Sequence, residues 1–180
     1  MSYAIENSTG SREFRFLREQ LGLSRKELAE LMGVTVKSVE RWETAKEPVS
    51  GTPAVLRRIF REFPDVAAYF EIPDQEFPLR IWYMRKNERC TMIDVDEKSR
   101  RVHIRNYTTD YLDCAFGKNE HPTYEEYLEF LESRCFPQTR DKMKLMLEEL
   151  DLPFYDPMMI IEKTEGRMAE DDFHLQIERL

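Results

Sequence analysis

The spacing of apolar residues changes once along the chain, and three prolines mark the change. Residues 11–63 repeat apolar side chains every three or four positions, which is typical of amphipathic helices. From residue 79 onward, short stretches alternate apolar and polar residues, which predicts strands. Pro64, Pro73 and Pro78 lie between the two patterns, and proline interrupts both helices and sheets. We therefore predict a flexible N-terminus at 1–10, an all-helical domain at 11–63, a connection at 64–78 and an α+β domain at 79–180.

The two expected domains differ in charge. Residues 1–62 hold 11 Lys and Arg against 9 Asp and Glu, whereas residues 63–180 hold 16 against 26. The net charge of -8 therefore belongs to the second part, and the first part is slightly basic. Such an asymmetry indicates two parts with different partners.

The rest of the composition excludes several classes of protein. Cys90, Cys114 and Cys135 lie far apart and form no CxxC pair, so neither a zinc knuckle nor a disulfide framework fits. Reduced thiols are typical of the cytosol. No run approaches 18 apolar residues, and residues 1–10 carry no signal-peptide pattern. We therefore expect a cytoplasmic protein without a membrane partner.

Two short helices separated by a tight turn stand out in the first domain. Ser24 is a good N-cap, and Glu27 three residues later completes a capping box. That helix ends at Gly33, which suits the left-handed position of a turn. Thr35 can cap the next helix, which runs to about Glu43. Two helices with this spacing form a helix-turn-helix, whose second helix can enter a DNA major groove.

The sequence LREQLGLSRKELAELMGVTVKSVERWE closely resembles the lambda-repressor/Cro-like (Xre-type) family over about Phe14 to Phe63. Ala45 stands where that family usually has glycine, so the turn that follows the second helix is expected to differ. The resemblance implies a transcriptional repressor that binds a palindromic DNA operator as a homodimer, in the cytoplasm on the nucleoid. Val39 and Trp42 would then face the small core.

The outward face of the second helix would meet the DNA. Lys37 and Arg41 can donate to guanine, and Val36 can pack on a thymine methyl. Glu40 could accept from cytosine or position Arg41 through a charge pair. Phosphate contacts, which set register and not sequence, are expected from Thr35, Ser38, Lys46, Arg25 and Lys26.

The second domain is expected to contain an antiparallel meander followed by helices. Trp82 has apolar neighbours on both sides in IWYM, so its strand is either buried on both faces or shared with another chain. A methionine and leucine stripe over Met143–Leu150 is either core or an adaptable partner surface. The expected strands are Leu79–Lys86, Arg89–Asp96, Arg101–Tyr107 and Phe173–Ile177, and the expected helices begin near Thr123, Pro137 and Asp156.

No catalytic motif is evident in the second domain. Asp171, Asp172 and His174 could bind a divalent cation, but a solvated acidic tail explains them better. His103 and His121 have no partner that the sequence reveals. We therefore predict no cofactor and no enzyme activity, and an enzyme targeted by its DNA-binding domain is a minor alternative.

The order of elements in residues 79–178 resembles the small N-terminal subdomain of HipA-like toxin kinases. The likeness lies in IWYMRKNERCTMIDVD, in Ser133-Arg134 with Pro137 and Arg140 before an amphipathic helix, and in the Gly166–Phe173 ending. It implies an antitoxin that represses its own operon and binds a HipA-like kinase through residues 79–180. The alternative is a stand-alone Xre-type regulator whose acidic domain serves dimerisation or ligand sensing.

Overall fold

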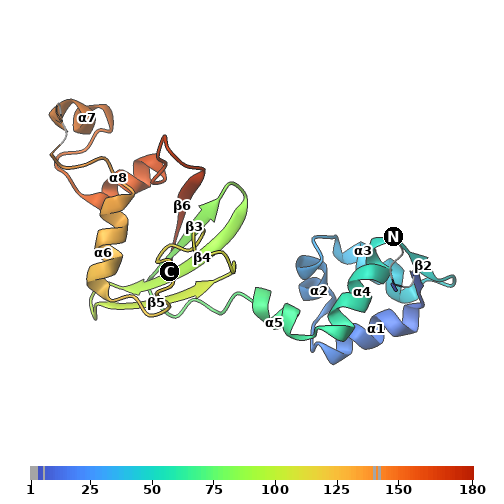
Figure 1. The fold of residues 1–180 in the computed structure, drawn as a ribbon. Helices are drawn as coiled ribbons and strands as arrows, with labels where there is room; N and C mark the ends of the chain where they lie inside the picture. Colours follow the sequence, from blue (N-terminus) through green and yellow to red (C-terminus); the bar gives the residue numbers. More distant parts are fainter. Residues whose placement is uncertain (1–3, 6, 140, 142) are drawn as a thin grey trace. The chain divides into compact units, whose positions relative to one another are not determined.

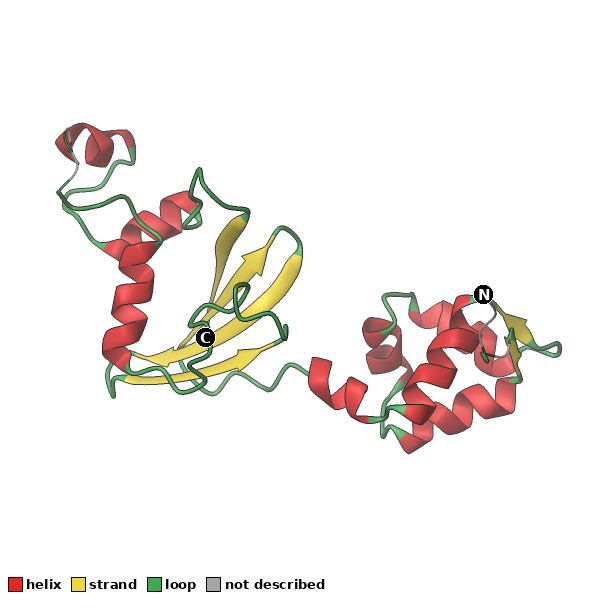
Figure 2. Cartoon of the chain, in the orientation of Figure 1, coloured by secondary structure: helices red, strands yellow, loops and turns green. Residues whose placement is uncertain are grey.

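The computed structural model describes residues 4–5, 7–139, 141 and 143–180 and contains two compact units, 1–72 and 73–180. The first is built mainly of helices, and the second has an antiparallel sheet with helices (Figures 1 and 2). The predicted α+β arrangement is confirmed. The division after residue 72 lies inside the expected connection, and the short helix of that stretch belongs to the first unit. Arg140 lies outside the described residues.

The turn between the second and third helices follows from local hydrogen bonds. The Ser24 hydroxyl accepts from the Glu27 backbone N–H, and the Glu27 carboxylate accepts from the Ser24 N–H at 2.6 Å. Gly33 has a φ of 62°, which a side chain would disfavour. Thr35 caps the third helix by accepting from the Ser38 N–H. The helices of this unit are α1 (Ser11–Gln20), α2 (Arg25–Leu31), α3 (Val36–Thr44), α4 (Thr52–Glu62) and α5 (Asp65–Phe70).

The first unit also contains a small pair of strands that the sequence did not predict. Strand β1 (Ser8–Thr9) pairs antiparallel with β2 (Val49–Ser50). Thr9 is buried, and its hydroxyl donates to the Glu13 carboxylate at 3.2 Å. Residues 8 and 9 of the expected flexible end therefore form a strand, because they pair with residues 42 and 40 positions later.

The core of the first unit lies between α1, α2 and α3. Phe14, Leu28 and Val39 are fully buried, and the rings of Phe14 and Trp42 meet edge to face at 5.3 Å. Val39 and Trp42 therefore face the core, as expected. Phe63, one residue after the end of α4, is 62% exposed.

The second unit is built on one four-stranded antiparallel sheet in the order β5-β4-β3-β6. The last strand of the chain pairs with β3, so β3 is internal, and its side chains are buried on both faces except at Arg85. Trp82 lies on the face of β3 away from the main core, beside Met84 and Met92. The strands are β3 (Leu79–Arg85), β4 (Glu88–Asp96), β5 (Arg101–Asn106) and β6 (Phe173–Arg179).

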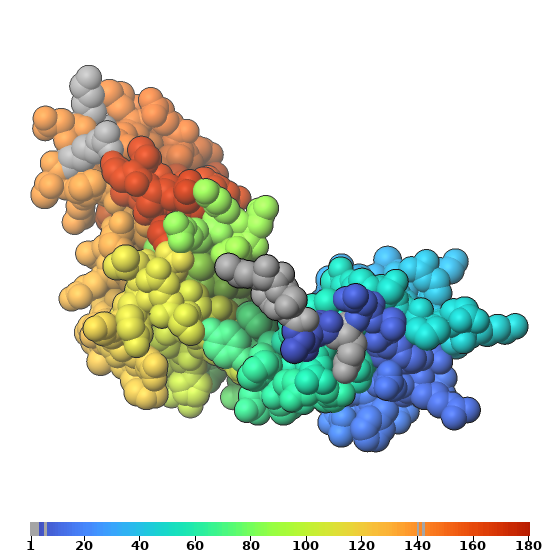
Figure 3. Space-filling model, turned by 45° about the vertical axis from the view of Figure 1, so that its right-hand side comes forward, coloured from blue at the N-terminus to red at the C-terminus, as the bar shows by residue number. Residues whose placement is uncertain are grey.

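Helices α6 (Tyr124–Ser133) and α8 (Pro157–Thr164) cover the other face of the sheet (Figure 1). Ile81 and Ile93 from the sheet pack with Tyr127 and Ile160 from the helices. Helix α7 (Met143–Glu149) begins six residues after Pro137, where the sequence had predicted a start, and lies away from the sheet (Figures 1 and 3). Its apolar stripe is only half-buried.

Candidate nucleic-acid interface

Helix α3 presents a polar face to solvent. Lys37, Glu40 and Arg41 are exposed on it, and Val36 at its first position is 44% exposed. A shallow hollow runs along this face and is lined by Thr35, Lys37, Ser38, Glu40, Arg41 and Thr44. Helix phase explains the arrangement, because Val39 and Trp42 on the opposite side hold the helix to the core.

A buried carboxylate fixes the other end of α3. The side chain of Glu43 is fully buried and accepts from the Arg18 Nε at 2.6 Å and from the Arg25 Nε at 2.7 Å. Burial alone would raise the pKa of Glu43, but the two guanidinium groups outweigh it and hold that pKa below its ordinary value. Glu43 therefore joins α1, the start of α2 and α3 through two ion pairs.

Arg25 and Glu40 meet across the turn between α2 and α3. The guanidinium of Arg25, which we expect to contact a phosphate, binds Glu43, and that hydrogen bond is the main cause of its raised pKa. The Glu40 carboxylate lies 3.7 Å from Arg25, so Glu40 does not depend on Arg41 for a charge partner. Sequence spacing missed this contact because it joins two helices across the turn.

The other expected contact residues border the same face. The hydroxyl groups of Thr35 and Ser38 lie 3.0 Å apart at the N-terminus of α3. Lys26 and Lys46 are exposed. Ala45 ends α3 with φ -61° and ψ 136°, an extended conformation that needs no glycine.

The acidic group near the C-terminus is part of the fold and not a solvated tail. The Asp171 carboxylate accepts two hydrogen bonds from the buried Arg134, at 2.6 and 3.1 Å. Arg134 also donates to the backbone carbonyls of Gly166 and Phe173. Lys86 lies 3.1 Å from Asp172.

His174, the third member of the suspected cation site, is buried on β6. Among the described residues, no group of three His, Cys, Asp or Glu side chains is placed to hold a metal ion. Asp171 instead positions Arg134, which closes the loop before β6. The sequence did not reveal this role, because the two residues are 37 positions apart.

A hollow along strand β5 brings together residues that the sequence left unconnected. His103 on β5 and His121 before α6 both line it, together with Phe77 and Glu120. Only the chain path from β5 to α6 brings His121 to the same hollow as His103. We call this feature the β5 hollow.

Comparison with known protein families agrees with the geometry of the first unit. A family model described as a helix-turn-helix domain matches residues 11–61. Residues 11–61 are a helix-turn-helix domain. This domain supports a role as a DNA-binding regulator. A search of curated proteins found no match, and neither did a search of solved structures. None of the helices in the described part of the chain is long and apolar enough to cross a membrane.

Proposed function

We propose that the helix-turn-helix domain represses transcription by binding a specific DNA operator through α3. The observation that carries this proposal is the exposed face of α3, where Lys37 and Arg41 stand beside the hydroxyls of Thr35 and Ser38. Basic side chains on the outward face of such a helix can reach base edges in the major groove, while hydroxyl groups beside them can contact phosphates. Lys26 and Lys46 add two exposed cations that can contact the phosphate backbone of the DNA.

Footprinting tests the assignment of α3. A selected operator would be protected by the unaltered protein, and Arg41→Ala should relax the preference at one base pair by about 1–3 kcal/mol. An Arg41→Ala protein with unchanged sequence preference would overturn the role of α3 in reading DNA. Arg12→Ala on α1 is a matched control, because it removes an exposed arginine from another helix.

Two copies are needed for tight binding in this proposal. The first 62 residues carry a charge of only +2, so non-specific attraction to phosphates is weak. A homodimer would place its two α3 helices in half-sites about one helical turn apart on a palindromic operator. Light scattering with and without operator DNA measures whether the complex contains two chains.

We propose in addition that the second unit makes the protein the antitoxin of a HipA-like kinase, in the cytoplasm on the nucleoid. The resemblance of residues 79–178 supports this role, and so does the presence of a core distinct from that of the first unit. The net charge of -10 on residues 63–180 disfavours contact with DNA and suits a protein partner. Co-purification of a kinase encoded beside the gene tests it, and separate migration at micromolar concentrations overturns it.

The alternative is a stand-alone Xre-type regulator whose second unit senses a ligand or forms the dimer. The β5 hollow favours this alternative, because concave sites with a few polar groups are where small ligands bind. The absence of a neighbouring kinase gene, combined with dimers that depend on residues 73–180, would favour it over the antitoxin role.

A further inference from the structure

Strand β5 has one edge that pairs with no other strand in the described part of the chain. It lies at the end of the β5-β4-β3-β6 order and pairs with β4 alone. An edge strand presents backbone N–H and C=O groups that can accept a further strand. The free edge of β5 could therefore be occupied by a further strand.

The register shows which backbone groups face the free edge. The Tyr107 N–H donates to the Cys90 carbonyl at 2.8 Å, one residue beyond β5. Hydrogen-bonded and non-hydrogen-bonded pairs alternate along an antiparallel ladder. The N–H and C=O groups of Val102, Ile104 and Asn106 therefore point away from β4, toward the open edge.

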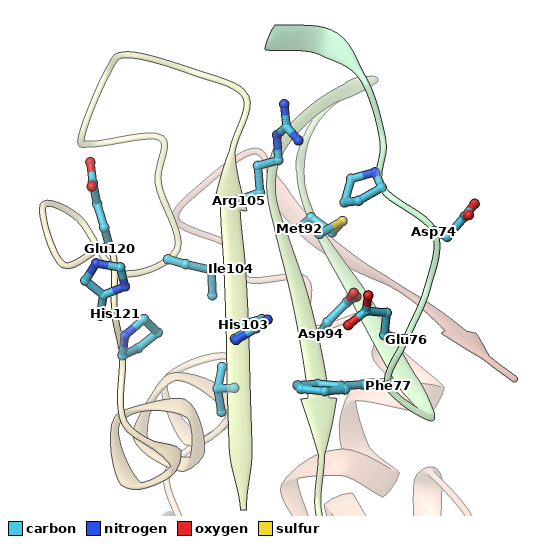
Figure 4. A pocket seen from close by; sticks show the side chains of 13 residues that line it. Asp74, Glu76, Phe77, Met92, Asp94, His103, Ile104, Arg105, Glu120 and His121 are labelled. Carbon is cyan, nitrogen blue, oxygen red and sulfur yellow. The ribbon is translucent and has the colours of Figure 1, made fainter. Parts of the chain in front are cut away.

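The β5 hollow lies along this edge and not on one face of the sheet. In Figure 4, His103 points to one side of β5, toward Asp94 and Glu76. Ile104 points to the other side, toward His121. A hollow lined by side chains from both faces of a strand must pass over the strand's edge, because successive side chains point to opposite faces. The hollow is thus a slot between the segments that carry Glu76 and His121.

Charges alternate across the sheet toward this slot. Glu178 on β6 is opposite Arg80 on β3, Arg80 is opposite Asp94 on β4, and Asp94 is opposite His103 on β5. The Arg80 guanidinium binds both Asp94 oxygens at 2.6 Å. A carboxylate placed opposite His103 on a strand added beside β5 could accept a hydrogen bond from its imidazole.

The cation at the start of β5 adds to this preference. The side chain of Arg101 is 63% exposed, lies 3.5 Å from Asp96 on β4 and sits over the Phe77 ring. Phe77 itself lines the slot. On the core side, Val102 and Ile104 are half-buried and would adjoin aliphatic side chains of an added strand.

We propose that the slot along β5 binds an extended segment of a protein partner that alternates acidic and aliphatic residues. The acidic residues would face Arg101 and His103, and backbone hydrogen bonds would form with Val102 and Ile104. This inference rests on the proposal that the second unit binds a protein. Glu76 and Glu120 stand on the two rims, so the segment carries its acidic residues only where it faces β5.

A second copy of the same strand does not fit the slot. An antiparallel β5–β5 pair centred on His103 would place Arg101 of each copy opposite Arg105 of the other. Like charges directly opposite each other destabilise a strand pair. The occupant is therefore a different segment, and not the partner subunit's β5.

A synthetic peptide tests the proposal directly. The probe is a fluorescent peptide of about ten residues that alternates Glu and Val, with a Lys–Val peptide as its counterpart. Fluorescence anisotropy measures affinity, and amide hydrogen exchange followed by NMR locates the site. The Glu–Val peptide should slow exchange at Val102 and Ile104, whereas the Lys–Val peptide should not. Equal protection by the Lys–Val peptide, or no protection at these amides, overturns the proposal.

Two variants separate strand addition from simple attraction. Val102→Pro removes an outward N–H, and proline is tolerated in an edge strand at such a position. We expect it to abolish binding of the Glu–Val peptide, while Val102→Thr keeps both the branched shape and the N–H and should bind as before. Arg101→Glu should weaken binding about fivefold or more. Lys163→Glu, an equal charge change at an exposed site on α8, should not.

Circular dichroism and thermal unfolding would show whether each variant folds. If Val102→Pro fails to fold, the exchange measurement on the unaltered protein and Arg101→Glu still decide the matter. Undiminished peptide binding by Arg101→Glu, or loss of binding by Lys163→Glu to the same extent, contradicts the proposal.

The same variants separate this inference from the antitoxin role. If the kinase co-purifies equally with the unaltered protein and with Val102→Pro, the kinase binds elsewhere. The slot along β5 is then not its docking site, and the β5 inference fails. If no kinase co-purifies with the unaltered protein while the peptide still protects Val102, the antitoxin role fails and the slot remains a peptide site.

Discussion

The Nε of Arg25, at the first position of α2, lies 2.7 Å from Oε2 of Glu43 in the last turn of α3. Because Arg18 of α1 binds the other oxygen of the same carboxylate, three helices meet at one buried charge. The orientation of the exposed face of α3 depends on this contact as well as on the packing of Val39 and Trp42.

Glu43→Gln should destabilise the first unit by about 2–3 kcal/mol, because it leaves two guanidinium groups beside a neutral amide in a buried site. Urea unfolding followed by Trp42 fluorescence, in a Trp82→Phe background, measures the change. Glu40→Gln is the matched control: its carboxylate is 56% exposed, so its loss should cost less than about 0.5 kcal/mol. Equal effects of the two substitutions would contradict the central role of Glu43.

The stability of the first unit should also fall in acid because of Glu43. Its pKa is lower in the folded protein than the ordinary value of 4.5, so folding favours the ionised form. This contribution is complete above pH 4.5 and is lost as the pH falls through the lower, folded pKa. The difference in unfolding free energy between the unaltered protein and Glu43→Gln should therefore shrink as the pH falls from about 5 through the lowered, folded pKa of Glu43. A difference that stays constant over this range would argue against an ionised Glu43.

Lys46→Ala should weaken DNA binding by a similar factor for every sequence. An exposed lysine that meets a phosphate releases about one counterion, so the slope of log affinity against log salt should become shallower by about 1. Binding titrations at several salt concentrations on operator and non-operator DNA measure both quantities. A change in sequence preference at an unchanged slope would instead assign Lys46 to a base contact.

Gly166→Ala should destabilise the second unit by about 2 kcal/mol. Gly166 has a φ of 59°, and an added Cβ would lie 3.1 Å from Leu175 Cδ1 and 3.3 Å from Arg134 Cβ. Gly117 has a φ of 57° but open space around it. Gly117→Ala should therefore lower the free energy of unfolding only by the cost of a left-handed backbone at a residue with a side chain, about 1 kcal/mol. Unfolding followed by Trp82 fluorescence, in a Trp42→Phe background, compares the two, and identical losses would show that crowding at Arg134 is unimportant.

Elements that depend on neighbouring residues could be predicted well. The capping box at Ser24 forms as expected, and α6 begins after Thr123, where a helix start was predicted. The three meander strands match within one residue at each end, because the alternation that predicts them is a local pattern. Helix α7 was predicted to start too early, since proline permits a helix start without requiring one. Strand β1 was missed because two residues carry no periodic pattern.

The candidate interface also has features that the sequence predicts and features that it does not. The outward positions on α3 follow from helix phase once Val39 and Trp42 are identified as apolar anchors. The partners of Arg25 and Glu40 do not, because side chains that meet across a turn depend on the angle between two helices.

The sequence by itself determined the change from helices to sheet, the tight turn at Gly33 and the face of α3 that is exposed to solvent. These depend on interactions within a few positions, where propensity and spacing act directly. Only the tertiary structure decided that Glu43 holds Arg18 and Arg25, that Asp171 binds Arg134 and that β5 borders an open slot. The reason is physical: each joins residues brought together by the packing of whole elements, and the chain path that brings them together leaves no local pattern.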